Sequence, residues 1–355
     1  TKGGDLWRYS LPLVNGLGMP YLQVNRNKKS ICLNLKDPEA KEIFYRLVKD
    51  ADVVVEQYRP GVAQRLGVDY DTLKKLNEKI VYCSISGFGQ TGPYRLLAGH
   101  DINYISYAGI LGLTARKGEC PVLPGVQIGD VSGGALYAVI GILMALMGVK
   151  QTGKGQYIDT AMFDGAVSMM HWNASSCLAG GEAMQPQGNI LIGQLACYNV
   201  YETKDGRYIS LGAVEAHLWG NFCEKIGHPE FTDSQRKVEK QHDMIAFLRT
   251  LFRSKTLEEW KQLLADTDCC WSPVATVDEV MNDPQVMARG MITEMTDPQG
   301  EYGTVKFIAS PLKLSETPAR NELFPPRKGE HTREVLRGCG YSEEEIDKFY
   351  ADGAV

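Results

Sequence analysis

A histidine and two carboxylates stand at loop-to-helix boundaries in the middle of this chain. His100 and Asp101 are adjacent in Gly99-His100-Asp101-Ile102-Asn103-Tyr104, where a loop rich in glycine and proline enters an apolar segment. Thirty residues beyond His100, Asp130 lies at the start of a long apolar run. An imidazole titrates near neutral pH, and a carboxylate with an environment of its own can serve as the complementary acid or base. These residues predict proton-transfer chemistry, unless each carboxylate only caps a helix.

Two further carboxylates, Asp164 and Glu215, lie at positions that suggest either a structural or a catalytic role. Asp164 interrupts the otherwise apolar segment Ala161-Met162-Phe163-Asp164-Gly165-Ala166-Val167. A lone carboxylate on an apolar helix is costly unless it is paired or used, so Asp164 has either a hidden hydrogen-bonding role or a function. Glu215 follows a predicted strand and precedes a predicted helix. An acid there is also favoured by the helix dipole alone.

A glycine-rich loop, Gly87-Phe88-Gly89-Gln90-Thr91-Gly92, follows a predicted strand and matches the pattern GxGxxG. The dinucleotide-binding fingerprint also requires the glycines to open a helix. Here Pro93 and Tyr94 come next, and the next predicted helix begins near Asp101. The sequence therefore favours a loop whose backbone approaches some other ligand, or a plain loop, over a nicotinamide or flavin site.

Three cations flank predicted strands. Lys28 and Lys29 precede one strand, and Arg59 follows another. Ligands of open α/β sheets bind beyond the carboxyl ends of the strands, which suits Arg59 as a phosphate ligand. Scattered surface lysines and arginines are common, however, so charge alone favours ordinary surface cations over phosphate ligands for all three.

Composition excludes several classes of protein. The chain has 355 residues, 44% hydrophobic and 23% charged, with a net charge of −5, which argues against general nucleic-acid binding. Nine cysteines without a CxxC pair, and no secretion signal, predict a reducing, cytoplasmic compartment and no metal site. The longest apolar run, residues 135–149, falls short of the roughly 20 residues that span a bilayer. We expect it to be a buried helix and the protein to make no use of a membrane.

Alternating strands and helices in the first half predict βαβ units and a parallel sheet. Strands are expected at residues 31–35, 52–55, 80–86 and 156–159, and helices from Asp37-Pro38 and at 70–77, 101–113, 130–149 and 160–172. After residue 193 the pattern changes to a hairpin around Lys204-Asp205-Gly206. Helices at 218–226, 242–252 and 257–265, a strand at 302–308 and a helix at 332–337 complete the second half.

The expected architecture is α/β, with a large Rossmann-like parallel-sheet domain and a smaller α+β domain. We place the large domain at residues 1–178 and a linker rich in glycine, proline and glutamine at 179–197. The small domain follows at 198–309, and the tail 310–355 is expected to return to the large domain.

Taken together, these motifs resemble the class III (CaiB/BaiF) CoA-transferase family, and within it the α-methylacyl-CoA racemase branch. The motifs that carry the resemblance are Tyr58-Arg59-Pro60-Gly61, Gly87–Pro93, Gly99–Tyr104, Gly129-Asp130, Gly153-Lys154-Gly155-Gln156 and Gly212-Ala213-Val214-Glu215. The resemblance runs from about Gly3 to the C-terminal tail.

The resemblance implies roles for four residues, His100, Asp130, Glu215 and Asp164. His100 and Asp130 would exchange the α-proton of an acyl-CoA thioester from opposite faces, and Glu215, eighty-five residues beyond Asp130, would hold the imidazole. The backbone N–H of Asp101 is our candidate donor to the enolate oxygen. The transferase branch instead uses an aspartate at the position of Asp164 as a nucleophile, which forms an acyl anhydride and then a CoA thioester.

The resemblance also implies an interlocked homodimer, with each site between the large domain of one subunit and the small domain of the other. CoA would enter only as part of the substrate, without another cofactor, and would lie near Lys28, Lys29, Arg59, Gly87 and Gly89. Family members carry a further strand, helix and strand ahead of the matched segment, which this chain is expected to lack.

The main hypothesis is therefore racemisation or epimerisation of a 2-methylacyl-CoA or related thioester. The alternative is a CoA-transferase with Asp164 as nucleophile. A third reading is a chain that binds CoA thioesters, or only dimerises, without catalysis.

Overall fold

The computed structural model describes residues 3–355, so the first two residues of the expected large domain lie outside it. By its internal contacts the chain forms two compact units. The first unit comprises the described residues up to Asp52, then Gln64–Ile80 and Thr276–Val355; the second comprises Val53–Ala63 and Val81–Ala275. The expected boundaries at 178, 197 and 309 stay predictions, although residues 179–197 contain no helix or strand.

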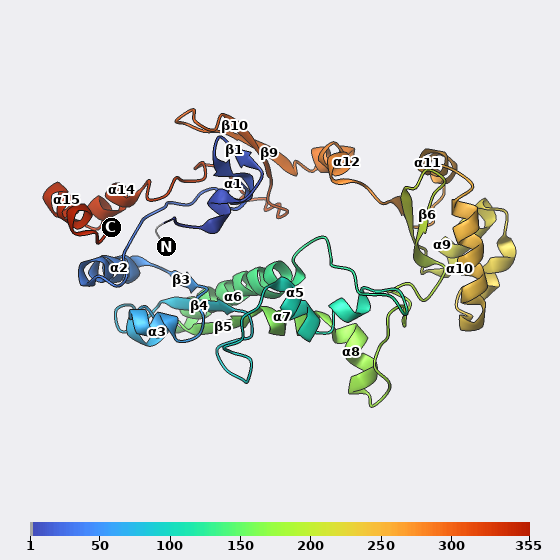
Figure 1. Cartoon of the computed structure of the whole chain (residues 1–355), viewed down its shortest axis with the longest axis horizontal. Coiled ribbons are helices and arrows are strands. Elements are labelled where there is room, and N and C mark those ends of the chain that lie inside the picture. The colour runs from blue at the N-terminus through green and yellow to red at the C-terminus, as the bar shows by residue number, and fades with distance from the viewer. Residues whose placement is uncertain (1–2) are drawn as a thin grey trace. The chain divides into compact units, whose positions relative to one another are not determined.

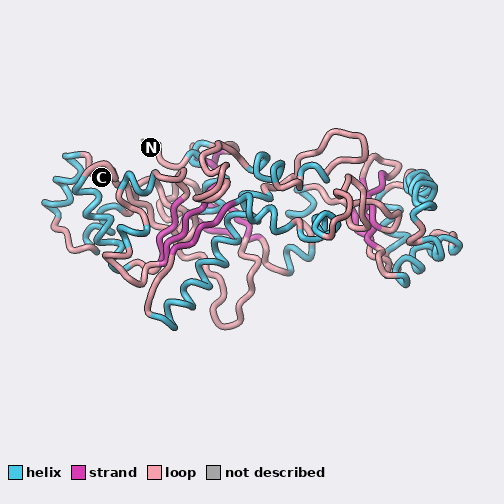
Figure 2. The backbone as a smooth tube through the Cα atoms, turned by 90° about the horizontal axis from the view of Figure 1, so that it is seen from below, coloured by secondary structure: helices cyan, strands magenta, loops and turns pink. Residues whose placement is uncertain are grey.

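The second unit contains a three-stranded parallel sheet. Its order is β3 (Val53–Glu56), β4 (Val81–Ser86) and β5 (Tyr157–Ala161), and Figure 2 shows the three strands side by side. Glu56, Ser84 and Asp159 are register partners across it. The parallel pairing confirms the predicted α/β class, and it brings the carboxyl ends of the three strands to one edge of the sheet.

Helices accompany this sheet, as can be followed in Figure 1. They are α5 (Asp101–Tyr107), the short η2 (Leu111–Leu113), the π-helix η3 (Ile128–Leu136), α6 (Tyr137–Thr152), α7 (Met162–Met169) and α8 (His171–Leu178). Helix α6 contacts β4 and β5, and it ends at Gly153, whose φ of 71° is left-handed and suits glycine.

The expectation that residues 135–149 form a buried helix is wrong for the single chain. Helix α6 exposes large apolar side chains along one face, among them Val139, Ile140, Leu143, Met144 and Met147. Joined to η3, it forms a helical stretch of 25 residues, Ile128–Thr152, that by length and composition alone could cross a membrane. The apolar run thus predicted that a helix forms, but not whether its apolar face is buried within the chain.

The second half of the second unit is a small α+β fold. Strands β6 (Tyr198–Glu202), β7 (Tyr208–Gly212) and β8 (Trp271–Pro273) pair antiparallel, which confirms the predicted hairpin. Its helices are α9 (Ala216–Lys225), η4 (Pro229–Ser234), α10 (Val238–Phe252) and α11 (Leu257–Leu264). Aromatic side chains fill the core: Tyr201, Trp219, Phe222, Phe252 and Trp260 are each at most 1% exposed.

The first unit joins the two ends of the chain. Its N-terminal elements are η1 (Leu6–Tyr9), β1 (Leu13–Val14), β2 (Leu17–Gly18), α1 (Met19–Val24), α2 (Pro38–Asp50) and α4 (Tyr70–Leu73), and α3 (Val62–Leu66) spans the boundary between the units. Its C-terminal elements are α12 (Val277–Met281), α13 (Pro284–Ala288), β9 (Ile292–Thr296), β10 (Thr304–Ile308), α14 (Thr332–Gly338) and α15 (Glu343–Asp352). Ala40 and Ile43 of α2 share a buried cluster with Leu336, Ile346 and Phe349 of the tail.

The predicted strand at residues 31–35 is wrong. This segment pairs with no strand, because two of its backbone donors bond the tail instead. The Cys32 N–H donates to Thr332 Oγ1 at 3.2 Å, and the Asn34 N–H donates to the Ala354 carbonyl at 2.8 Å. The adjacent helix α2 begins as predicted, with Asp37 accepting from the Glu39 and Ala40 N–H groups.

Candidate active site

The glycine loop after β4 wraps around the ring of Tyr104. A Cβ on Gly87 would lie 2.6 Å from that ring and a Cβ on Gly99 2.8 Å from it, so both positions need glycine. The Tyr104 hydroxyl donates to the Gly99 carbonyl at 2.6 Å, and the Gly89 N–H donates to Ser86 Oγ at 3.0 Å. This loop does not open a helix: the next helix, α5, begins only at Asp101.

His100 is the residue that precedes α5, and its side chain is exposed. Its backbone N–H donates to Asn103 Oδ1 at 3.0 Å, which fixes the entry into the helix. Among the described residues, the N–H of Asp101 in the first turn has no hydrogen-bond acceptor. The imidazole and this free donor therefore lie next to each other at the beginning of α5.

Asp130 lies in the first turn of η3 and is half-buried. Its backbone N–H donates to Asp101 Oδ1 at 3.0 Å, so the starts of α5 and η3 are joined. Burial raises the pKa of Asp130, the negative charge of Asp101 raises it further, and the positive charge of His100 lowers it. His100, Asp101 and Asp130 thus form one electrostatic cluster, as the sequence hypothesis requires of two proton-transfer groups.

Asp164 lies on α7 and is exposed, not hidden among apolar side chains. Partial burial raises its pKa, and the charge of Asp159 on β5 raises it further. The structure describes no hydrogen bond or ion pair of the Asp164 carboxylate. The described contacts therefore do not support a buried hydrogen-bonding role for the Asp164 side chain.

Glu215 precedes α9 and is exposed, and its carbonyl accepts the Trp219 N–H at 3.1 Å. Within the described chain, no hydrogen bond or ion pair joins Glu215 to His100 or Asp130. The contact between Glu215 and the imidazole was expected between two subunits, and no described bond forms it within one chain. The role of Glu215 therefore stays a prediction.

The predicted CoA-binding cations are engaged locally. Lys28 donates to Asn25 Oδ1 at 3.1 Å, and Lys29 forms an ion pair with Glu334 at 2.6 Å. Arg59, just beyond β3, donates to the Leu96 carbonyl at 2.6 Å. All of these groups are exposed, so a phosphate would have to compete with weak surface contacts only.

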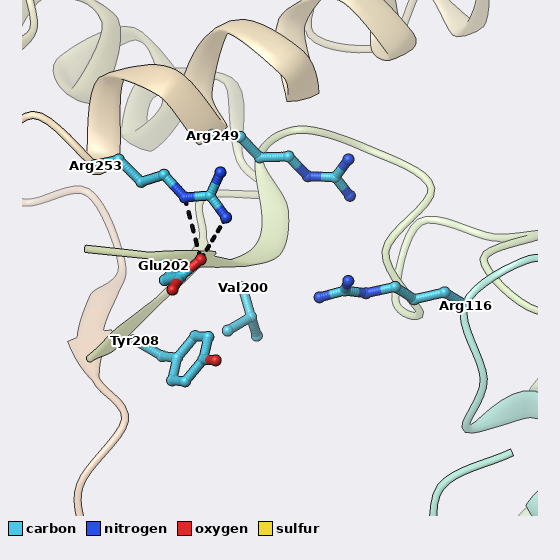
Figure 3. A pocket seen from close by; sticks show the side chains of 6 residues that line it. All are labelled: Arg116, Val200, Glu202, Tyr208, Arg249 and Arg253. Carbon is cyan, nitrogen blue, oxygen red and sulfur yellow. Dashed lines mark hydrogen bonds and ion pairs between the residues drawn. The ribbon is translucent and has the colours of Figure 1, made fainter. Parts of the chain in front are cut away.

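The structure contains an arginine-lined pocket that the sequence did not predict. It has a volume of about 340 Å³ and is lined by Arg116, Val200, Glu202, Tyr208, Arg249 and Arg253 (Figure 3). Arg253 pairs with Glu202, whereas Arg116 and Arg249 form no ion pair with any described residue. The spacing of Arg249 and Arg253, four residues apart on one helix, was the signal available.

A cluster of aromatic rings around Phe88 also went unpredicted. Its ring packs against those of Tyr94, Tyr104, Tyr107 and Phe163, which ties the glycine loop to α5 and α7. Across residues 3–355, no group of three or more His, Cys, Asp or Glu side chains is arranged to hold a metal ion.

Comparisons with known proteins cover nearly the whole chain. Residues 1–332 match the family model described as CoA-transferase family III. The chain is 33% identical over 341 residues to an acyl-CoA transferase of Fusarium pseudograminearum, covering 94% of this chain and 74% of that protein. It is 34% identical over 333 residues to the alpha-methylacyl-CoA racemase of Homo sapiens, covering 93% of this chain and 85% of that protein.

A solved structure gives the same result. A CaiB/BaiF family protein from Brucella suis has a TM-score of 0.77 and 30% sequence identity, covering 91% of this chain and 84% of that one. Relatives are thus named both as racemases and as transferases, while sequence and fold agree on the family. The chain belongs to CoA-transferase family III.

Proposed function

We propose that this protein racemises or epimerises the α-carbon of a 2-methylacyl-CoA, or a related acyl-CoA thioester, by proton transfer between His100 and Asp130. The observation that carries the proposal is the hydrogen bond from the Asp130 N–H to Asp101 Oδ1, which joins the start of η3 to the start of α5, where His100 stands. A racemase needs a base on one face of the α-carbon and an acid on the other, and these two side chains differ in type and environment.

The chemistry assigns a task to each group. One of the pair removes the α-proton, the resulting enolate loses its handedness, and the other returns a proton to the opposite face. The raised pKa of Asp130 makes its acid form more available toward neutral pH. The Asp101 N–H, which has no acceptor among the described residues, is the donor we assign to the enolate oxygen.

Two copies of the chain would complete the site in this proposal. Glu215 of a second subunit would orient the His100 imidazole, because no described hydrogen bond or ion pair joins Glu215 to His100 within one chain. The exposed apolar side chains of α6 support a second copy as the cover of this helix in an interlocked homodimer. A membrane is the other possible cover, and the oligomeric state tests the choice.

The CoA part of the substrate would bind near Lys28, Lys29 and Arg59, with Gly87 and Gly89 admitting it close to the backbone. No other cofactor is proposed. The nine described cysteines are free thiols, which supports a reducing compartment such as the cytoplasm.

Exchange of the α-proton tests the proposal. In D₂O, without any carboxylic acid as acceptor, the protein should incorporate deuterium at the α-carbon of (2R)- and (2S)-2-methylacyl-CoA and interconvert them. His100→Ala and Asp130→Asn should each lower this rate by at least about 100-fold, as expected for loss of a general acid or base. Exchange that persists in both variants would contradict the assignment.

Transfer of CoA between carboxylic acids is the second candidate, and the exposed Asp164 carboxylate favours it. In that reaction Asp164 attacks the thioester carbonyl and expels CoA thiolate, which leaves a mixed anhydride. The thiolate then attacks the aspartyl carbonyl of this anhydride, breaks its bond to the acyl carboxylate, which departs, and gives an aspartyl-CoA thioester. Hydroxylamine-sensitive labelling of the protein by acyl-CoA, abolished in Asp164→Asn, would support the transferase. No such labelling of the unaltered protein, together with full α-proton exchange in Asp164→Asn, would exclude it.

A further inference from the structure

The Asp101 side chain holds the beginning of the helix that carries Asp130. Its Oδ1 accepts the Asp130 N–H at 3.0 Å, although the two residues are 29 positions apart. The first N–H groups of any helix lack an acceptor within the helix, so an acceptor from outside fixes where the helix begins. Asp101 supplies this acceptor from the start of α5.

Gly129 is what lets the carboxylate approach so closely. A Cβ on this buried residue would lie 3.1 Å from Asp101 Oδ1 and 3.3 Å from Tyr104 Cβ. Both distances are tighter than ordinary van der Waals contact, so a side chain at Gly129 would displace Asp101 or the helix start.

The charges around Asp130 come from identifiable elements. His100, Asp101 and Tyr104 stand at or on α5, with His100 and Asp101 opposing each other in their effect on the Asp130 pKa. Helix α7 packs against η3 and carries Asp164, but the charge that acts on Asp164 is Asp159 on β5. Asp101 is therefore the negative group that acts on Asp130.

Resting on the proposed proton transfer, we propose that the Asp101 carboxylate is a positioning residue: it fixes the Asp130 main chain at the start of η3 and places a like charge beside the Asp130 carboxyl. This role is separate from the donor role of the Asp101 N–H. Asp101 would thus serve the proposed active site twice, with its main-chain N–H as a donor and with its side-chain carboxylate as a positioning group.

Substitutions separate the two parts of this role. Asp101→Asn keeps an oxygen acceptor of the same shape but removes the charge. Gly129→Ala keeps the charge but crowds the contact. Asp159→Asn is the matched control, because it removes a carboxylate that acts on Asp164 and not on Asp130.

Carbon NMR of the full chain with ¹³C-labelled aspartate measures the result without substrate. Asp101→Asn should lower the Asp130 titration midpoint, by on the order of one pH unit, because a like charge has been removed. Asp159→Asn should leave that midpoint unchanged while lowering that of Asp164. An Asp130 midpoint that does not move in Asp101→Asn would overturn the proposal.

The experiment distinguishes failure of the positioning role of Asp101 from failure of the proposed racemisation. If the Asp130 midpoint moves but the unaltered protein exchanges no α-proton, the positioning role stands and the proposed racemisation fails. If both hold, the limb of the exchange–pH profile that reports Asp130 should move by the same amount in Asp101→Asn. An exchange profile that keeps its limb despite the shifted midpoint would contradict a role of Asp101 in catalysis.

Discussion

The backbones of Gly133 and Gly165 meet where η3 crosses α7. A Cβ on Gly165 would lie 2.0 Å from the Gly133 carbonyl oxygen, and a Cβ on Gly133 would lie 2.5 Å from the Met162 carbonyl oxygen. No side chain fits at this crossing. It sets the position of Asp130, three residues before Gly133, relative to Asp164, the residue before Gly165.

The first prediction follows from this crossing. Gly165→Ala should destabilise the protein by about 1–3 kcal/mol, because the added methyl meets rigid backbone and the helices must separate. Gly148→Ala on α6 is the control: its Cβ would have only one contact, at 3.7 Å, and a helical alanine should be neutral or slightly stabilising. Urea denaturation of both variants measures the difference, and equal stabilities would refute the close crossing.

A second prediction concerns the buried carboxylate of Asp297 in the first unit. Its side chain is 0% exposed and pairs with Arg327 at 2.9 Å. Burial raises the pKa of Asp297, but hydrogen bonds from Arg327 and from the Tyr302 and Gln299 N–H groups outweigh it, so the pKa is lowered.

A lowered pKa means that folding favours the ionised form of Asp297. Its contribution to stability is therefore present above the unfolded pKa of about 3.9 and is lost as pH falls through the folded value. Arg327→Ala should cost about 3–5 kcal/mol at pH 7, because it leaves a buried charge unpaired, and less in strong acid. Arg333→Ala, which breaks only exposed pairs, should cost about 1 kcal/mol or less. Urea denaturation at pH 7 and in strong acid measures the free energy of unfolding of both variants. An equal loss of stability in Arg327→Ala and Arg333→Ala at pH 7 would contradict the buried ion pair.

A third prediction concerns the exposed face of α6. Leu143→Glu and Met147→Glu together should convert a homodimer into monomers, because charge replaces apolar surface that a second copy would bury. Val238→Glu on α10, which is also exposed, should leave the mass unchanged. Light scattering after size exclusion measures the mass. Monomeric unaltered protein that co-floats with lipid vesicles would instead identify a membrane as the cover.

A fourth prediction tests whether a site is shared between subunits. His100→Ala and Glu215→Gln should each be inactive alone. Co-expressed, they should regain roughly a quarter of the activity, because half of the randomly formed dimers would contain one intact site. If both residues served the same chain, every site would carry one substitution and no activity would return.

Local patterns determined much of this protein. The hairpin at β6–β7 followed from Asp205-Gly206 between two alternating runs, and α2 followed from Asp37-Pro38, because turns and helix caps depend on neighbouring residues alone. The residue types of His100 and Asp130 predicted proton-transfer chemistry, and the family resemblance paired them. The resemblance of ordered motifs identified the family.

Only the tertiary structure decided the rest. The segment at residues 31–35 looked like a strand, but its donors are taken by residues some 300 positions away. The apolarity of α6 could not reveal which of its faces would be covered. Likewise, Asp101 was ambiguous in sequence between a helix cap and an acid, and Asp164 between a hidden hydrogen-bonding role and a function. The long-range contact from the Asp130 N–H to Asp101 Oδ1 and the exposure of Asp164 came only from the tertiary structure, because both depend on how distant segments pack.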